Sequence, residues 1–127
     1  MVNQVGKIAW IDLTVENCRS VADFYQSVMG WNLTPVEVED YQDFCAVLPG
    51  TDTPIAGICH KRGANQSIPS QWMMYVTVDD LEQSMRQCEE QGGEVIIRSR
   101  DMGSFGRMSI IPDPAGAHCA IVQSAGD

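Results

Sequence analysis

The sequence predicts an α+β domain built from two tandem βαβββ modules, and three observations predict it. A shift of 63 positions, the distance from residue 10 to residue 73, brings Trp10–Asn17 onto Met73–Asp80 with the same apolar alternation. The shift needs no gap further along the chain, where it aligns Gly30 with Gly93, Pro49 with Pro112 and Ile58 with Ile121. Each copy then reads as strand, helix and three strands. A long period seen twice indicates two fused copies of one module, with a ligand site where they meet.

The first module is predicted from local patterns. Residues 8–15 alternate as a strand does, and Asn17 can cap a helix over 18–29. One apolar stripe runs along that helix, through Val21, Phe24, Tyr25 and Val28. Gly30 ends the helix as a left-handed cap. Strands are predicted at 31–39, 43–48 and 53–60, with an acidic turn at Glu39–Asp40.

The second module repeats this order. A strand at 72–78 leads to Asp79 or Asp80 as the cap of a helix that runs to about 91 and ends at Gly92–Gly93. Strands follow at 94–99, 105–111 and 117–123. Residues 61–71 have the Gly, Asn, Ser and Pro content of an exposed linker. We therefore expect one domain over 1–127, with modules at 7–60 and 72–124.

The period of two residues in a strand assigns faces. The helix side of the two first strands is predicted to hold Ile11, Leu13, Val15, Met74, Val76 and Val78. The opposite face is predicted to hold Trp10, Asp12, Thr14, Met73, Tyr75 and Thr77. Polar and amphipathic groups away from the helix favour a cavity lining over a dry core.

Composition limits the possible partners. The formal charge of −9, from 8 basic and 17 acidic residues, repels phosphate backbones and excludes nucleic acid as a partner. The same charge either draws cations toward a cleft or only keeps the protein soluble. No segment is long enough to cross a membrane, and residues 1–7 lack the apolar stretch of a signal peptide, so we expect a cytoplasmic protein.

The cysteines give no sign of a disulfide framework or a zinc motif. There are five of them, with no C-x-x-C pair, at Cys18, Cys45, Cys59, Cys88 and Cys119. We expect reduced thiols that pack as small apolar groups.

Four short motifs carry a family resemblance: Phe24–Tyr25, Gly30–Trp31, Val78–Leu81 and Asp113–Gly116. In their order and spacing, and with the duplication, the chain resembles the vicinal oxygen chelate superfamily of glyoxalase I, bleomycin-resistance proteins and extradiol dioxygenases. The resemblance implies that the modules' sheets curl into a barrel-like cavity and that the protein is a homodimer.

Enzymes of this family hold a divalent metal near the start of each module's first strand and in its last strand. Those places fall here on Trp10, Gly57, Met73 and Ala120. None offers a donor suited to such an ion, so we expect no metal and no cofactor there. Displaced ligands, Asp12 and His118, remain an alternative, whereas His60 is interpreted as a solvent-facing strand end.

The leading hypothesis is a protein that binds a small aromatic or cationic molecule in the inter-module cavity without metal. The predicted ligand residues are Trp10, Asp12, Met73, Tyr75 and His118. The alternative is an enzyme: a metal-dependent lyase, isomerase or dioxygenase of the superfamily, or a metal-free isomerase in which Asp12 or His118 moves a proton.

Overall fold

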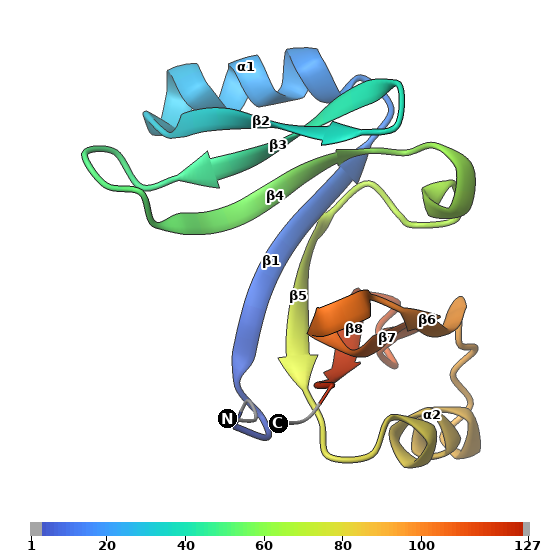
Figure 1. Cartoon of the computed structure of the whole chain (residues 1–127). Helices are drawn as coiled ribbons and strands as arrows, with labels where there is room; N and C mark the ends of the chain where they lie inside the picture. The colour runs from blue at the N-terminus through green and yellow to red at the C-terminus, as the bar shows by residue number, and fades with distance from the viewer. Residues whose placement is uncertain (1–3, 126–127) are drawn as a thin grey trace. The chain divides into compact units, whose positions relative to one another are not determined.

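The computed structural model describes residues 4–125 and has the strand and helix order βαβββ twice (Figure 1). The first module comprises β1 (Ile8–Val15), α1 (Cys18–Met29), β2 (Asn32–Val38), β3 (Tyr41–Val47) and β4 (Pro54–His60). A short 3₁₀ turn, η1 (Gly63–Asn65), lies in the predicted linker. The second module comprises β5 (Trp72–Thr77), α2 (Leu81–Glu90), β6 (Ile97–Asp101), η2 (Gly103–Phe105), β7 (Arg107–Pro112) and β8 (His118–Gln123). The predicted fold class of tandem βαβββ modules is confirmed.

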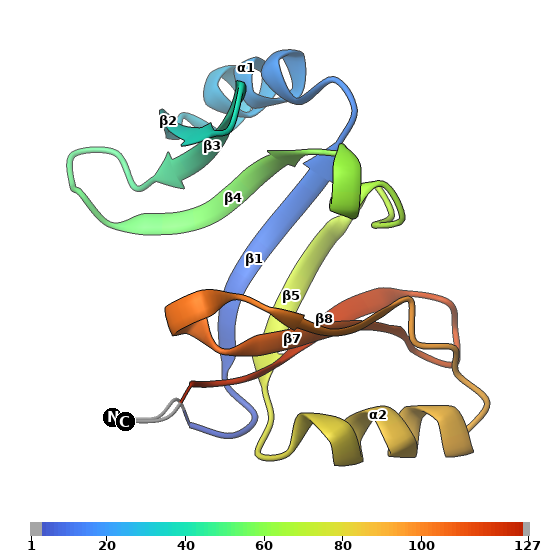
Figure 2. The same ribbon diagram turned by 45° about the vertical axis from the view of Figure 1, so that its right-hand side comes forward.

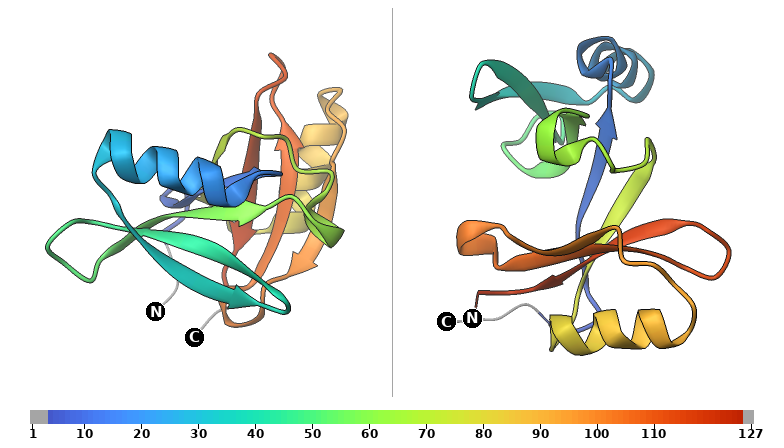
Figure 3. Two further views of the ribbon diagram at one scale, coloured as in Figure 1. Left: turned by 90° about the horizontal axis from the view of Figure 1, so that it is seen from above. Right: turned by 90° about the vertical axis from the view of Figure 1, so that its right-hand side faces the viewer.

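The chain divides into two compact units. The first unit is Ile11–Trp72, and the second unit contains the described residues 4–10 and 73–125. The strand order is β2-β3-β4-β1 in the first module and β5-β8-β7-β6 in the second. In each unit the helix packs on its own strands: α1 on β2, β3 and β4 (Figure 3), and α2 on β7 and β8 (Figure 2). No helix within residues 4–125 combines the length and the apolar character of a membrane span.

The first and last strands of each module pair in parallel, and their registers confirm the 63-residue repeat. In the first unit Asp12 lies beside Gly57 and Leu13 beside Ile58. In the second unit Tyr75 lies beside Ala120 and Val76 beside Ile121, each 63 positions further along the chain. The repeat therefore extends to which residues are neighbours in space.

The third strands do not follow the same shift. Cys45 of β3 lies opposite Gly57, whereas Ile110 of β7 lies opposite Ala120, so these two partners are 65 positions apart (45 to 110) instead of 63. The 63-residue shift would instead pair Val47 with Ile110, so it does not hold for these two strands. A register shift in β3 between Ala46 and Val47, where a bulge or irregularity interrupts the pairing, accompanies the difference.

The helix ends follow the sequence signals with one correction. Gly30 ends α1 at φ 77°, in the left-handed conformation, and Asp80 caps α2 by accepting a hydrogen bond from the Gln83 N–H at 3.1 Å. Asn17 precedes α1 as predicted, but its side chain makes no capping hydrogen bond. The backbone carbonyl of Asn17 instead accepts from the Ser20 hydroxyl at 3.1 Å.

The core of the first unit lies between α1 and the sheet. Its buried residues are Leu13, Val15, Cys18, Ala22, Phe44 and Ile58. An aromatic group closes one end: the rings of Tyr25 and Trp31 stack at 5.7 Å, and the Trp72 indole N–H donates to the Tyr25 hydroxyl at 2.9 Å. Leu13 and Val15 thus take the predicted helix side. Ile11 shares that face by strand alternation, but it is 40% exposed and is not part of the buried core.

The core of the second unit contains Leu81, Met85 and Ile121, with Val78, Val95 and Ile111 packed against them. The Ser109 hydroxyl donates to the Met85 sulfur at 3.1 Å, which satisfies a polar group within this apolar layer. Met74, predicted for the helix side, lies by strand alternation on the face opposite Met73 and Tyr75, but it is 44% exposed and is not part of this core.

Two glycines with positive φ should differ sharply when they are replaced by alanine. At Gly30 an added Cβ meets no atom within 4 Å, so Gly30→Ala should cost only the strain of the left-handed backbone, about 1–2 kcal/mol. At Gly106 the Cβ would lie 2.0 Å from the Gln123 carbonyl oxygen, so the backbone itself must move. Urea unfolding should show a much larger loss of stability for Gly106→Ala. Equal losses would contradict the geometry at Gly106.

Candidate functional site

The face of the first unit that points away from α1 is polar. One row of neighbours across three strands, Leu13, Ile58 and Phe44, belongs to the core. Because side chains alternate along a strand, the adjacent row of Asp12, Gly57 and Cys45 points to the other face. Thr14 and Cys59 form the next neighbouring pair on that face. The residues beside Asp12 are thus a glycine and, one strand further, a thiol.

Asp12 and Cys59 are bonded within this face. The Cys59 thiol donates to Asp12 Oδ2 at 3.6 Å. Burial, and then the nearby Asp12 carboxylate, raise the pKa of the Cys59 thiol far above its ordinary value. The same two causes, in the same order, raise the pKa of the Cys45 thiol. Both thiols therefore stay protonated at neutral pH and act as weak donors rather than as nucleophiles.

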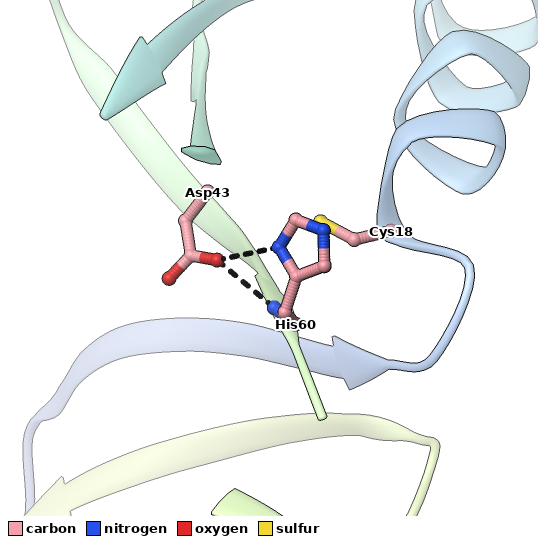
Figure 4. A group of neighbouring side chains, drawn as sticks. All are labelled: Cys18, Asp43 and His60. Carbon is pink, nitrogen blue, oxygen red and sulfur yellow. Dashed lines mark hydrogen bonds and ion pairs between the residues drawn. The ribbon is translucent and has the colours of Figure 1, made fainter. Parts of the chain in front are cut away.

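A second polar group lies where α1 begins and β4 ends. The His60 backbone N–H donates a hydrogen bond to Asp43 Oδ1 at 2.9 Å, and the His60 ring nitrogen Nδ1 lies 3.0 Å from the same oxygen (Figure 4). The Cys18 thiol donates to the Ile58 carbonyl at 3.4 Å and is 1% exposed. Burial, with a smaller effect from Asp43, raises the pKa of the Cys18 thiol to about 12. A donor atom from each of the three side chains lies within 4.8 Å of the other two.

The corresponding row of the second unit has a different character. Tyr75, Ala120 and Ile110 take the places of Asp12, Gly57 and Cys45. These three side chains are buried. The two modules share a fold, but only the first one carries a carboxylate and thiols on this face.

The predicted ligand residues fall in both units. Asp12 belongs to the first unit, whereas Trp10, Met73, Tyr75 and His118 belong to the second. Within the second unit the β5–β8 register places Met73, Tyr75 and His118 on one face, away from α2. Met73 and Tyr75 are buried, whereas Trp10, Asp12 and His118 are half-buried. The cavity between the modules stays a prediction.

The group of Cys18, Asp43 and His60 was not predicted from the sequence. His60 was expected to be a solvent-facing strand end, but its side chain is only 19% exposed and lies on Asp43. Asp43 and Cys18 were not singled out as a group, because they are distant from His60 in sequence and no local spacing connects them. One signal was available: His60 shares the parity of Ile58, which points toward α1. The five thiols are free, as expected.

The paired βαβββ order and the register repeat agree with the family to which the chain belongs by its sequence. The sequence model of the Glyoxalase/Bleomycin resistance protein/Dioxygenase superfamily matches residues 7–121. Among similar proteins, a Mycobacterium tuberculosis protein named as a glyoxylase, CFP32, is 27% identical over 98% of this chain and 47% of its own length. The anthracycline biosynthesis protein DnrV of Streptomyces peucetius is 31% identical over 91% of this chain and 46% of its own length. The chain thus spans about half the length of these relatives.

Solved structures of similar fold include two epimerases. Methylmalonyl-CoA epimerase from Mycobacterium tuberculosis superposes with a TM-score of 0.54 at 16% identity, covering 99% of this chain and 94% of its own. A Streptomyces coelicolor methylmalonyl-CoA epimerase gives a TM-score of 0.56 at 15% identity, over 97% and 100% of the two chains. At these identities the likeness shows the fold alone.

Asp12→Asn should lower the pKa of the Cys59 thiol. The carboxylate opposes formation of the thiolate, so removing its charge favours ionisation, while burial, the larger cause, still holds the pKa above its ordinary value. Alkylation of Cys59 by iodoacetamide, followed by peptide mass spectrometry over a neutral-to-alkaline pH series, should begin at lower pH in the variant. Asp23→Asn, which removes an exposed carboxylate on α1, should leave the profile unchanged. Identical profiles for wild type and Asp12→Asn would contradict the coupling.

Proposed function

We propose that the chain binds a small aromatic or cationic molecule and does so without a metal ion at the family's ligand positions. On the first unit the ligand meets Asp12. Trp10, Met73, Tyr75 and His118 are the proposed ligand residues of the second unit. The observation that carries the proposal is the pairing of Asp12 with Gly57, because it joins a carboxylate to a position where the family usually has a metal ligand.

Two features support metal-free binding. The four family positions, Trp10, Gly57, Met73 and Ala120, offer no carboxylate, imidazole or thiolate to an ion. Gly57 and Ala120 have also become the small neighbours of Asp12 and Tyr75. Gly57 itself adds no side chain beside the half-buried carboxylate of Asp12.

The charge of Asp12 favours a cationic ligand. The thiol of Cys59 is a weak donor and leaves the carboxylate negative, so a ligand that brings a positive charge gains a charge-assisted hydrogen bond. The net charge of −9 raises the rate at which cations reach the protein.

The relatives named for anthracycline biosynthesis suggest suitable probes. Anthracyclines combine a flat aromatic ring system with an amino sugar, and removing the sugar gives a neutral aglycone. This pair separates the contribution of the aromatic face from that of the charge.

Asp12→Asn should weaken binding of an amino-sugar anthracycline by roughly 1.5 to 3 kcal/mol, the value of a lost charged hydrogen bond. Binding of the neutral aglycone should change little. Isothermal titration calorimetry on protein purified and assayed with a chelator measures both, and it excludes a metal-dependent contribution. The unfolding free energy should hardly change, because asparagine keeps the shape and one acceptor.

The control is Asp23→Asn, which removes the same charge from an exposed position on α1 where Asp23 pairs with Arg19. It should bind both compounds as the wild type does. If Asp12→Asn and Asp23→Asn bind the amino-sugar compound equally well, Asp12 is not in the site. Binding that disappears with the chelator would refute the metal-free reading.

We also expect a homodimer, from the family resemblance and from the modest core that a chain of this length can build. Sedimentation velocity at micromolar concentration should give the mass of two chains. A monomer at every concentration tested would overturn the expectation, while leaving the Asp12 experiment interpretable.

A further inference from the structure

Three side chains that bind transition metals converge within the first unit. Cys18 is the first residue of α1, Asp43 lies in β3, and His60 is the last residue of β4. Figure 4 shows the imidazole of His60 turned toward both the Asp43 carboxylate and the Cys18 sulfur. One donor atom from each lies within 4.8 Å of the others. This group belongs to Ile11–Trp72 alone and shares no residue with the four family positions.

The kinds of donor select a class of ion. Thiolate, imidazole and carboxylate are the three ligand types of Zn²⁺, whereas Mg²⁺ and Ca²⁺ take oxygen donors almost entirely. Two ligands of a tetrahedral zinc ion lie about 3.4 Å apart when each bond is about 2.1 Å. His60 Nδ1 and Asp43 Oδ1 are already 3.0 Å apart. A sulfur ligand lies about 3.6 Å from a nitrogen ligand, and the Cys18 sulfur lies within 4.8 Å of a ring nitrogen of His60.

The surroundings hold the ligands in place. The His60 backbone N–H donates to Asp43 Oδ1 at 2.9 Å and can keep that bond when an ion occupies the site. The Tyr41 ring packs edge-on against the imidazole, with 4.9 Å between centroids, and the Arg62 guanidinium lies over Tyr41 at 4.1 Å. Such outer contacts fix the orientation of metal ligands and sustain affinity.

The solvent exposure of the three side chains favours a metal site over a site with a nucleophilic thiol. The side chains of Asp43 and His60 are 16% and 19% exposed, so solvent reaches both of them. Cys18 is 1% exposed, so a substrate carbonyl cannot approach its sulfur as it would approach a catalytic thiol.

We propose that Cys18, Asp43 and His60 bind one divalent transition-metal ion of the zinc class, with water as the fourth ligand. When the ion binds, the Cys18 thiol loses its proton to solvent. The imidazole of His60 keeps its single proton on Nε2, and its Nδ1 binds the ion. Since the three ligands come from α1, β3 and β4, the bound ion ties the start of the helix to the sheet and stabilises the first unit.

Cobalt and zinc binding to the full chain test the proposal. Protein stripped with a chelator and dialysed should bind one Zn²⁺ per chain in calorimetry, and its Tm should rise with the ion. Co²⁺ should give the near-ultraviolet charge-transfer absorption of a thiolate ligand. Cys18→Ser and His60→Gln should each lower the zinc affinity by at least about tenfold, because losing even an outer contact to a metal ligand costs about 10- to 100-fold. Cys18→Ser should also abolish the thiolate absorption.

Cys45→Ser is the matched control, because it removes another thiol of the same unit, one that donates to the Ala46 carbonyl at 3.7 Å and whose pKa is raised by burial and Asp12. It should keep the cobalt absorption and the rise in Tm. Two results would overturn the proposal: a wild-type protein that binds no stoichiometric zinc at micromolar concentration, or variants Cys18→Ser and His60→Gln that bind as the wild type does. If Cys18→Ser fails to fold, the affinity of His60→Gln decides.

Discussion

The parallel pairing of the first and last strand in each module is the constraint on which the rest of the structure depends. Parallel neighbours cannot be joined by a tight turn, so a long connection must separate them in the chain, and here α1, β2 and β3 supply it. The outer hairpin can change its register by two residues, as β3 and β7 do, without moving the paired strands. The neighbours Asp12–Gly57 and Tyr75–Ala120 are therefore the most firmly specified part of the repeat.

Local patterns made the first strand and helix predictable to the residue. β1 (Ile8–Val15) and α1 (Cys18–Met29) match the expected bounds, because alternation, the apolar stripe and Gly30 are all short-range signals. β6 (Ile97–Asp101) lies later than the predicted 94–99, and Ser99 takes a positive φ of 47°, which no sequence signal marks. The His60–Asp43 contact was not predictable from spacing, since it depends on how β3 and β4 pair. Local sequence patterns thus predicted the helices and strands, whereas the pairing of β3 with β4 determined which side chains meet in the candidate site.

The two modules have kept one fold and divided its surfaces differently. The first unit has a carboxylate and two thiols on the face away from its helix, along with an imidazole at the end of β4. The second unit fills the matching row with Tyr75, Ala120 and Ile110. The matching row therefore offers charge and weak donors in the first unit and buried, mostly apolar side chains in the second. Duplication followed by divergence of this kind provides two chemistries from one backbone plan.

Gly57 also sets the mutational routes open to this protein. A glutamate introduced at 57 would stand one strand away from Asp12, about 5 Å across the sheet. Two like charges that close cannot both ionise cheaply without a cation between them. A carboxylate on β4 would therefore avoid this repulsion only if Asp12 were replaced at the same time.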